Sequence, residues 1–369
     1  MTDSIDEAVR RHELALHELS VGRLSQALEA CVDAVAKLEQ ASGHESLDVA
    51  VALNTLGRIR EGLSEYSAAE SDFERAWMIV AGSDSDDESM VTLRARTLGD
   101  RARLRRIQGR LPEAEHCYLQ AMEMLRDGSL DLDILRNELA VVYKYAARFD
   151  EAEALYRQSL ESVEAGLGPA HPEAATIWHN LGGLEHARGR YAEGEVYARR
   201  SVSIREAAMG ADHPAVAADV AALAALVHEQ GRLDEAETLY RRAVAIFETA
   251  REQNAYELAV NYNNLGALHY AREQWCEAEG YYMRALGLKE GLFGPDHPDI
   301  AMTLHNLAVL NADRGRNDEA RVLYQRALAI FEDRLGPEHP KTRTCRRELT
   351  ELGRGPEGWA SSTSSSVHP

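Results

Sequence analysis

The sequence predicts an all-α solenoid of about eight helical hairpins followed by one capping helix. A leucine recurs along the 369-residue chain at seven intervals of 42 residues and one of 41: Leu14, Leu56, Leu98, Leu139, Leu181, Leu223, Leu265, Leu307 and Leu349. A small residue recurs in the second half of each unit at steps of 42, apart from one step of 45 and one of 38: Ala27, Ala69, Ala114, Ala152, Gly194, Ala236, Ala278 and Ala320. No change of composition interrupts the array, so these repeats predict one stacked structure rather than separate domains.

The unit that starts at His297 shows why each repeat is a hairpin. Its first segment places leucines on one face over 304–310, at helical spacing, and Gly315 ends it. The second segment, 320–331, carries alanine, leucine and aromatic residues with the same period. Gly336-Pro337 stops this segment, because glycine accepts the left-handed C-cap conformation and proline cannot continue a helix.

Small and aromatic residues are expected to form the core. Gly182 and Gly266 directly follow two of the recurrent leucines, and the small residues of the second helices should stand opposite them, so the helix axes can approach closely. An aromatic residue stands four positions after most of the small residues: Phe73, Tyr118, Tyr156, Tyr240, Tyr282 and Tyr324. We interpret this stripe as core, without chemistry of its own.

Histidines and charged pairs in the repeats are also interpreted as structural. Four histidines precede prolines in the linkers between units, where we expect them to cap helices: His171, His213, His297 and His339. The pairs Glu153/Arg157, Glu195/Arg199 and Glu237/Arg241 have the spacing of i,i+4 contacts on an exposed helix face.

These motifs resemble a known family. Leu-Gly, then a small residue thirteen positions later, an aromatic residue and a second alanine, resembles the tetratricopeptide repeat. The linkers GPAHP (168–172), GADHP (210–214), GPDHP (294–298) and GPEHP (336–340) resemble the repeats of kinesin light chains and related bacterial proteins. The resemblance covers about residues 5–353, and the motifs HNLGGL, NNLGAL and HNLAVL share in it.

The resemblance implies a right-handed superhelical solenoid whose first helices line a concave face. Residues 341–353 would be a ninth first helix that caps the array, so we expect one elongated domain over 1–353. The Ser- and Gly-rich tail, 354–369, is predicted to be disordered.

Composition excludes several partners. A formal net charge of −20 argues against nucleic acid and against an anionic membrane surface. The amino terminus is too charged for a signal peptide, and no apolar run is long enough to cross a membrane, so a cytoplasmic location is expected. Four scattered cysteines form no C-x-x-C pair and are predicted to be buried or half-buried fillers in a reducing compartment: Cys31, Cys117, Cys276 and Cys345.

Catalytic and cofactor motifs are missing from the sequence. His12 and His17 are five residues apart, one too many for the metalloprotease spacing, so no metal site is predicted. Neither a phosphate-binding glycine loop nor a nucleophile-elbow motif occurs. We therefore expect no cofactor and no enzymatic activity.

The face opposite the core of each first helix is the candidate binding site. Positions two before, two after and five after the recurrent leucine lie on it, at 100° per residue. In the resembling family this face holds an extended peptide. The predicted peptide-binding residues are Asn54, Arg58, Arg96, Arg103, Asn137, Lys144, His179, Asn180, His186, His228, Asn263, Asn264, Tyr270, His305 and Asn306.

Two residue types on this face each have two interpretations. Seven arginines and one acid lie between Arg94 and Arg110; they bind a ligand or pair with the acidic linker SDSDDES (83–89). Mid-helix asparagine is unusual, and it either holds a peptide backbone or forms hydrogen bonds between helices. In the third hairpin Gly109 lies eleven residues past Leu98, so the place of its extra turn is ambiguous, but Arg96 and Arg103 face the groove either way.

The sequence therefore predicts a non-enzymatic scaffold or adaptor that binds a peptide segment. An acidic group or C-terminal carboxylate of the ligand is expected against hairpins two to four, with Arg96 and Arg103 as donors. One alternative is a peptide- or partner-sensing regulatory protein of a bacterial signalling system. Another is an enzyme such as a peptide-controlled phosphatase, which lacks a visible site. The oligomeric state is left open.

Overall fold

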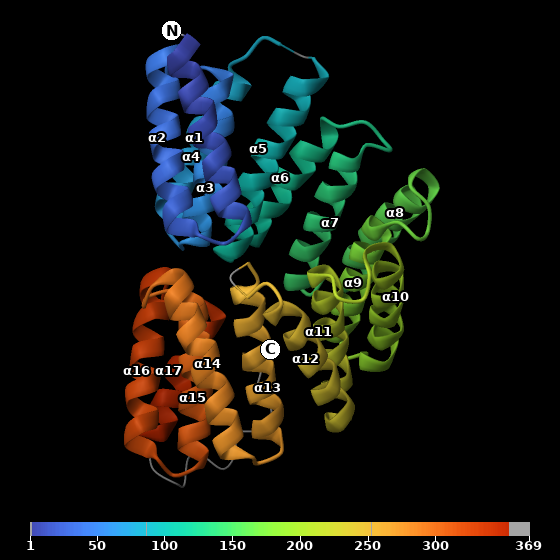
Figure 1. The fold of residues 1–369 in the computed structure, drawn as a ribbon, viewed down its shortest axis with the longest axis vertical. Helices are drawn as coiled ribbons and strands as arrows, with labels where there is room; N and C mark the ends of the chain where they lie inside the picture. Colours follow the sequence, from blue (N-terminus) through green and yellow to red (C-terminus); the bar gives the residue numbers. More distant parts are fainter. Residues whose placement is uncertain (1, 86, 252, 354–369) are drawn as a thin grey trace. The chain divides into compact units, whose positions relative to one another are not determined.

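The computed structural model describes residues 2–85, 87–251 and 253–353, so the predicted tail at 354–369 lies outside it. Within those residues the chain forms seventeen α-helices and no strand, which confirms the all-α prediction (Figure 1). The chain divides into two compact units, Met1–Ala222 (unit 1) and Leu223–Pro369 (unit 2).

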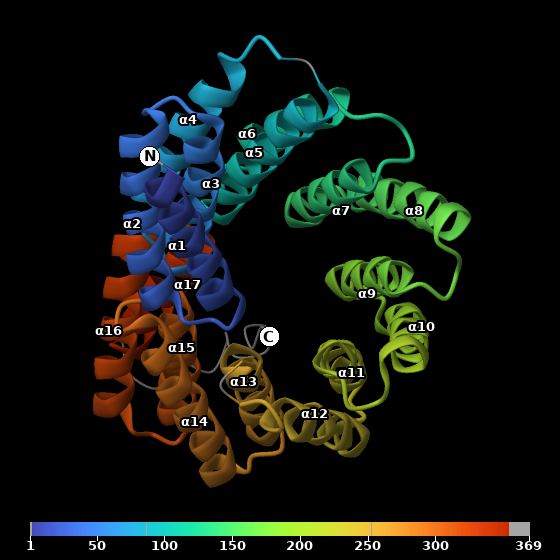
Figure 2. The same cartoon turned by 45° about the horizontal axis from the view of Figure 1, so that its top comes forward.

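Unit 1 consists of five antiparallel hairpins. Their helices are α1 (Thr2–Ser20) with α2 (Leu24–Ser42), α3 (Leu47–Gly62) with α4 (Tyr66–Ala81), α5 (Glu88–Ile107) with α6 (Leu111–Glu123), α7 (Leu130–Tyr145) with α8 (Phe149–Gly166), and α9 (Pro172–Ala187) with α10 (Tyr191–Met209). The first helices α1, α3, α5, α7 and α9 also contact one another in sequence order. Each hairpin is therefore stacked on the previous one (Figure 2).

Unit 2 repeats this arrangement. The boundary between the units falls inside α11 (Pro214–Glu229), and the helices that follow are α12 (Leu233–Glu248), α13 (Ala255–Ala271) with α14 (Trp275–Phe293), α15 (Pro298–Asp313) with α16 (Asn317–Arg334), and α17 (Pro340–Leu352). The first helices α13 and α15 contact each other, and α17, the last helix of the described residues, packs on α16. The predicted capping helix is thus confirmed.

The core is built from the recurrent residues. The leucines from Leu56 to Leu307 are all buried, whereas Leu14, in the first hairpin, is 41% exposed. The predicted aromatic stripe is confirmed as core: Phe73, Tyr118, Tyr156, Tyr240, Tyr282 and Tyr324 are at most 1% exposed.

Two glycines allow the predicted close approach of paired helices. A Cβ on Gly182 would lie 3.3 Å from the carbonyl oxygen of Gly194. A Cβ on Gly266 would lie 2.6 Å from the ring of Tyr282, so here the opposing group is the aromatic residue and not the small Ala278. A side chain larger than hydrogen at Gly266 would displace that buried ring.

The linker histidines cap the helices that follow them, as predicted. The imidazole Nδ1 accepts a hydrogen bond from the backbone N–H two residues later, in His171 (3.2 Å), His213 (3.1 Å), His297 (3.1 Å) and His339 (3.2 Å). Nδ1 lies three bonds from Cα, as the side-chain oxygen of an asparagine cap does, and the proline between donor and acceptor has no N–H to satisfy.

The structure also places the extra turn of the third hairpin. Helix α5 ends at Ile107, nine residues after Leu98, whereas α3 ends six residues after Leu56. The extra turn therefore follows Leu98, and Gly109 takes the left-handed conformation (φ 77°) between α5 and the short helix α6.

The cysteine prediction was wrong at one position. Cys31, Cys117 and Cys345 are buried, but Cys276 is exposed because it lies in the first turn of α14, where the helix starts at the surface. No helix in the described part of the chain is long and apolar enough to cross a membrane.

Candidate functional site

A row of polar contacts joins successive first helices, and we call it the polar ladder. In each contact the residue two before the recurrent leucine meets the residue one before the leucine of the next hairpin, 43 positions further on. The pairs are His12 Nε2 with Thr55 Oγ1 (2.9 Å), Asn54 Nδ2 with Thr97 Oγ1 (2.7 Å), Asn137 Oδ1 with Asn180 Nδ2 (2.7 Å), Asn263 Oδ1 with Asn306 Nδ2 (3.1 Å), and His305 Nε2 with Glu348 Oε2 (2.6 Å). Hydrogen bonding between helices, one of the two interpretations of the asparagines, is therefore present.

The ladder does not use all of the polar atoms. In the pair Asn137–Asn180, one amide donates and the other accepts, which leaves a donor group on Asn137 and a carbonyl oxygen on Asn180 for another partner. Asn264 is only 8% exposed, and its amide forms no hydrogen bond with any described residue. In the preceding repeat, the two ladder positions, 221 and 222, are both alanine, which has no polar side-chain atom.

Four predicted residues line one cavity in unit 1. Asn54 and Arg58 reach it from α3, and Arg96 and Arg103 from α5. The cavity measures about 310 Å³, and α7 closes its third side with Asp131, Ile134, Leu135 and Glu138. The structure thus brings together predicted residues of hairpins two and three.

The cavity also has an apolar wall that the sequence analysis missed. Val51, Leu93 and Ile134 line it, each five residues before a recurrent leucine, and Val51 and Ile134 are 39% and 49% exposed. Val9 holds the same position in the first hairpin and is exposed too. The signal was present, because these aliphatic residues recur at steps of 42, 42 and 41 in the first four repeats.

Two of the cavity arginines are engaged by carboxylates of the protein. Arg96 Nε lies 2.8 Å from Asp131 Oδ1 at an exposed position. Arg103 Nε lies 3.0 Å from Glu61 Oε1, and its Nη2 lies 3.2 Å from Asp100 Oδ1. Burial raises the pKa of Glu61 and of Asp100, against the opposing effect of Arg103. A ligand carboxylate could displace Asp131 from the exposed Arg96 more easily than Glu61 from the half-buried Arg103, because Asp131 is 26% and Glu61 only 13% exposed.

Arg58 differs from these two arginines. It is half-buried, and no hydrogen bond or ion pair joins its guanidinium to any residue in the described part of the chain. Its Nε is buried without a partner. Its charge still acts on the surroundings, because burial first and Arg58 second lower the pKa of His12. Arg58 is therefore a cation that lines the cavity without an ion pair to a carboxylate of the described residues.

The other arginines of the Arg94–Arg110 cluster mostly join the third hairpin to the hairpins before and after it. Arg94 donates to the backbone carbonyl oxygens of Val80 and Ser83, where the acidic linker begins. The remaining arginines have partners on neighbouring helices, in the pairs Arg101–Glu74, Arg105–Glu113, Arg106–Glu138 and Arg110–Glu70. Arg96 and Arg103 pair with Asp131 and Glu61 rather than with the linker.

The remaining predicted residues of unit 1 lie outside the cavity lining. Lys144 on α7 is half-buried beside Gly183 of α9. His179 Nδ1 lies 2.9 Å from Oδ1 of the buried Asp219, which Arg205 also contacts. The His186 ring meets the Tyr191 ring edge-on.

The predicted residues of unit 2 are mostly satisfied within it. Tyr270 donates its hydroxyl hydrogen to Asp313, and Asn263, His305 and Asn306 belong to the polar ladder. His228 is half-buried, and burial lowers its pKa.

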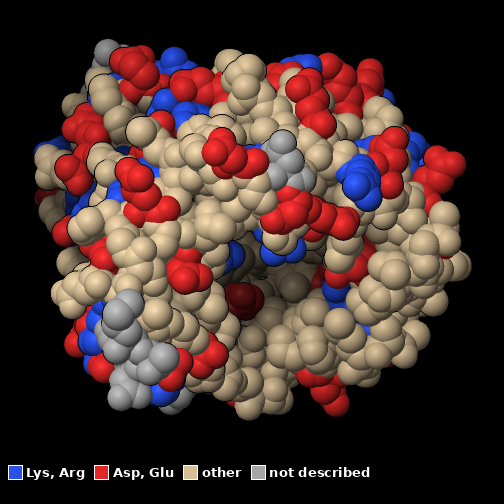
Figure 3. Space-filling view, turned by 90° about the horizontal axis from the view of Figure 1, so that it is seen from above, with Lys and Arg blue, Asp and Glu red and all other residues tan. Residues whose placement is uncertain are grey.

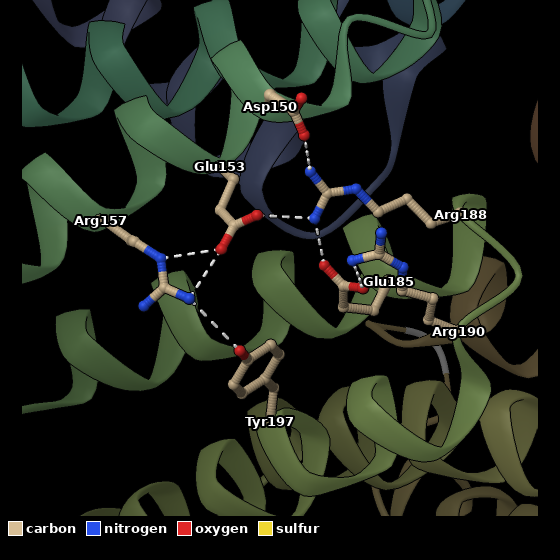
Figure 4. A network of polar contacts seen from close by, with 7 residues as sticks. All are labelled: Asp150, Glu153, Arg157, Glu185, Arg188, Arg190 and Tyr197. Atoms are coloured by element: carbon tan, nitrogen blue, oxygen red, sulfur yellow. Dashed lines mark hydrogen bonds and ion pairs between the residues drawn. The ribbon is translucent and has the colours of Figure 1, made fainter.

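The second helices of the hairpins carry another set of ion pairs. Arg188 at the end of α9 contacts Asp150 and Glu153 of α8, and Glu153 also receives Arg157 of its own helix (Figure 4). Unit 2 repeats the arrangement in Arg272 with Asp234 and Glu237. All three predicted i,i+4 pairs are confirmed, and Glu153 and Glu237 also take part in contacts between hairpins. On the face shown in Figure 3, acidic and basic side chains accordingly lie beside one another.

Comparison with known proteins identifies the repeats. The model of the tetratricopeptide repeat matches residues 130–193, 173–249, 257–333 and 300–352. The chain belongs to the tetratricopeptide repeat family. Its members typically build scaffolds for interactions between proteins. A comparison with curated proteins finds no match.

Solved structures similar to this chain include a Rap protein complexed with Competence and Sporulation Factor (13% identity, 95% of this chain and 98% of that chain, TM-score 0.55). Others are BtubC (BKLC) from P. vanneervenii (21%, 63% and 92%, 0.49) and a putative kinesin light chain from Podosopora anserina (22%, 56% and 99%, 0.45). The likeness to the Rap structure shows the same helical-repeat fold.

Proposed function

We propose that this protein is a non-enzymatic scaffold or adaptor that holds a peptide segment of a partner against its first helices. The observation that carries the proposal is the cavity of α3, α5 and α7, which is lined both by aliphatic side chains and by arginines. Concave sites with apolar walls and a few fixed polar groups are typical of ligand binding.

The cavity favours a ligand with an acidic group next to an apolar one. Val51, Leu93 and Ile134 offer contact to an aliphatic or aromatic side chain. Arg58 has no partner among the described residues, and the exposed Arg96 is bound only to the carboxylate of Asp131, so both are suited to donate to a ligand carboxylate. This supports the polarity predicted from the sequence, with the acidic group at hairpins two to four, and it adds Arg58 to Arg96 and Arg103.

Neutral amides would hold the rest of the peptide. Asn180 keeps a free carbonyl oxygen, and Asn263 keeps its amide N–H groups, after their ladder contacts. Asn264 has its whole amide available, as far as the described residues go. An extended backbone alternates donors and acceptors, and an amide side chain matches both.

Affinity capture with the full chain, followed by mass spectrometry, would identify partners, and binding of the captured segment as a labelled peptide would then be measured. We expect Arg96→Ala with Arg103→Ala to weaken binding by about 2–5 kcal/mol if the carboxylate contact is buried. Binding should also weaken with salt, less steeply in the variant. Arg157→Ala, an exposed arginine on α8, serves as the control. Normal binding by the folded double variant would contradict the proposed polarity.

A second candidate function is a regulatory protein that senses a peptide or partner. It is favoured by the similar Rap structure, which was solved in complex with Competence and Sporulation Factor. A sensor changes conformation when its ligand binds, whereas a scaffold does not need to. Small-angle scattering with and without the captured peptide separates the two: a change in radius of gyration supports the sensor, and an unchanged radius supports the scaffold.

A further inference from the structure

Lysine is rare in this chain, and its four occurrences differ in environment. Only Lys37, Lys144, Lys289 and Lys341 are lysines among 41 Lys and Arg residues. Lys37 Nζ lies 2.6 Å from Asp33 Oδ1, and Lys289 donates to the Asp299 carbonyl oxygen and the Thr303 hydroxyl. Lys341 is exposed in the first turn of α17.

Lys144 is a half-buried lysine that lacks a polar partner among the described residues. No hydrogen bond or ion pair joins its ammonium group to another described residue, although the side chain is half-buried. A lysine in this state is unusual, because a buried charge is normally paired.

The neighbours of Lys144 form a small cationic cluster. Lys144 Nζ lies 5.7 Å from the centroid of the exposed Tyr145 ring, and Arg106 Cζ lies 5.8 Å from the same centroid. Arg106 itself is held only loosely, 3.8 Å from Glu138 Oε2. On the α9 side, a Cβ built on Gly183 would lie 3.8 Å from Nζ, in van der Waals contact, so the amine lies close to the backbone of α9 and a larger side chain at 183 would crowd it.

This cluster favours the neutral amine. Burial first and the charge of Arg106 second lower the pKa of Lys144, and no carboxylate contacts it to reverse the effect. The amine fraction at pH 7 rises about tenfold for each pH unit by which the pKa falls. The neutral form is the nucleophile.

We propose that Lys144 is an acylation site that accepts an acyl group from a small acyl phosphate. The Nζ lone pair attacks the acyl carbon, a C–N bond forms, and the C–O bond to phosphate breaks. Phosphate leaves with the electron pair, and the proton released from nitrogen passes to water. Arg106 lies beside the amine and attracts the phosphate group of the donor. Acylation removes the ammonium charge from the face of α7, and the proposal stands independently of the proposed peptide binding.

The experiment treats the full chain with acetyl phosphate and follows the acetylation rate of each lysine by mass spectrometry between pH 7 and pH 10. We expect Lys144 to react faster than the exposed Lys341 at pH 7, because a lowered pKa increases the fraction of neutral amine. This advantage should shrink toward pH 10, because a lowered pKa matters less near the ordinary pKa of lysine side chains. A Lys144 rate at or below that of Lys341 at every pH would overturn the proposal.

Two variants test the role of the neighbours. Arg106→Gln should slow acetylation of Lys144 several-fold and leave the rate of Lys341 unchanged, with helix content checked by circular dichroism. Gly183→Val, which crowds the amine, should slow Lys144 in the same selective way. Should Arg106→Gln unfold, Lys144→Arg in otherwise intact protein still decides: the fastest acetylation must disappear from the intact mass, and its persistence would contradict the proposal.

Discussion

The first helices of unit 1 and unit 2 carry polar residues at equivalent repeat positions, yet these residues have different surroundings. In unit 2 most of them bond to one another across successive hairpins, in the pairs Tyr270–Asp313, Asn263–Asn306 and His305–Glu348, and Asn264 is an exception. In unit 1, Arg58 and Lys144 have no polar partner among the described residues, and Arg58 faces a cavity with an apolar wall. The position of a residue in the repeat therefore does not show whether it contacts a ligand or a neighbouring hairpin. That depends on which residue of the next hairpin faces it.

The largest expected loss of stability comes from removing a hydrogen-bonded group of unit 2. Glu348 accepts from His305 and from the Tyr324 hydroxyl (3.3 Å), and it is buried. Glu348→Ala leaves both groups unpaired and should destabilise the end of unit 2 by about 3 kcal/mol. Urea unfolding followed by circular dichroism measures this. Glu351→Ala on the same helix, which removes a more exposed carboxylate, should change stability by less than about 0.5 kcal/mol.

A second pair of variants contrasts two arginines of the same cavity. Arg103→Ala leaves Glu61 and Asp100 without their cation and should cost about 1–3 kcal/mol of stability. Arg58→Ala removes a cation that has no ion pair within the described chain, so the free energy of unfolding should change by no more than about 0.5 kcal/mol. Thermal unfolding of both variants tests the contrast. Equal losses would mean that Arg58 is a structural residue.

A third pair sharpens the comparison within unit 2. Asn306→Ala leaves Asn263 Oδ1 without its donor and should cost about 1–2 kcal/mol. Asn264→Ala, at the neighbouring ladder position, breaks no hydrogen bond in the described structure and should cost less than about 0.5 kcal/mol. Urea unfolding compares the two. A larger loss for Asn264→Ala would show that its amide already has a structural role.

The smallest effect concerns the histidine caps. Burial, and then Lys341 and Arg343, lower the pKa of His339 below its usual 6.5 in the folded chain. The unfolded chain then binds more protons, so the stability from this cap is present above pH 6.5 and is lost as pH falls through the lower folded pKa. We expect a loss of at most about 1 kcal/mol at the start of α17. His339→Asn keeps an acceptor at the cap and should flatten the pH dependence of unfolding between pH 5 and pH 7; an unchanged dependence would contradict this account.

The fold could be predicted from the sequence because each hairpin repeats its own local signals. The recurrent leucines indicate where each hairpin lies, the His-Pro caps mark the start of four helices, and the capping helix follows from the same spacing. Partners of the groove residues could not be predicted in this way. Helical spacing gives the face on which Asn137 lies, but its contact with Asn180 depends on how far one first helix is displaced along the next.

The apolar wall of the cavity was missed for a different reason. Val51, Leu93 and Ile134 recur with a clear period. The sequence prediction, however, rested on polar residues at three other positions of each helix and did not include the position five before the leucine. Arg58 was correctly placed on the face, whereas its lack of a partner depends on the absence of any nearby carboxylate, which only the packed structure shows.

The polar ladder also bears on how such a chain changes length during evolution. Each contact of the ladder, here called a rung, joins the residue two before one recurrent leucine to the residue one before the next leucine. The two residues are 43 positions apart, as in Asn263–Asn306 and His305–Glu348. Loss of one whole 42-residue unit between these rungs would place Asn263 opposite Glu348, an amide against a carboxylate, which can still bond. A duplication or deletion in whole units can therefore leave the remaining rungs matched, whereas one in any other number of residues would strand buried polar groups along the array.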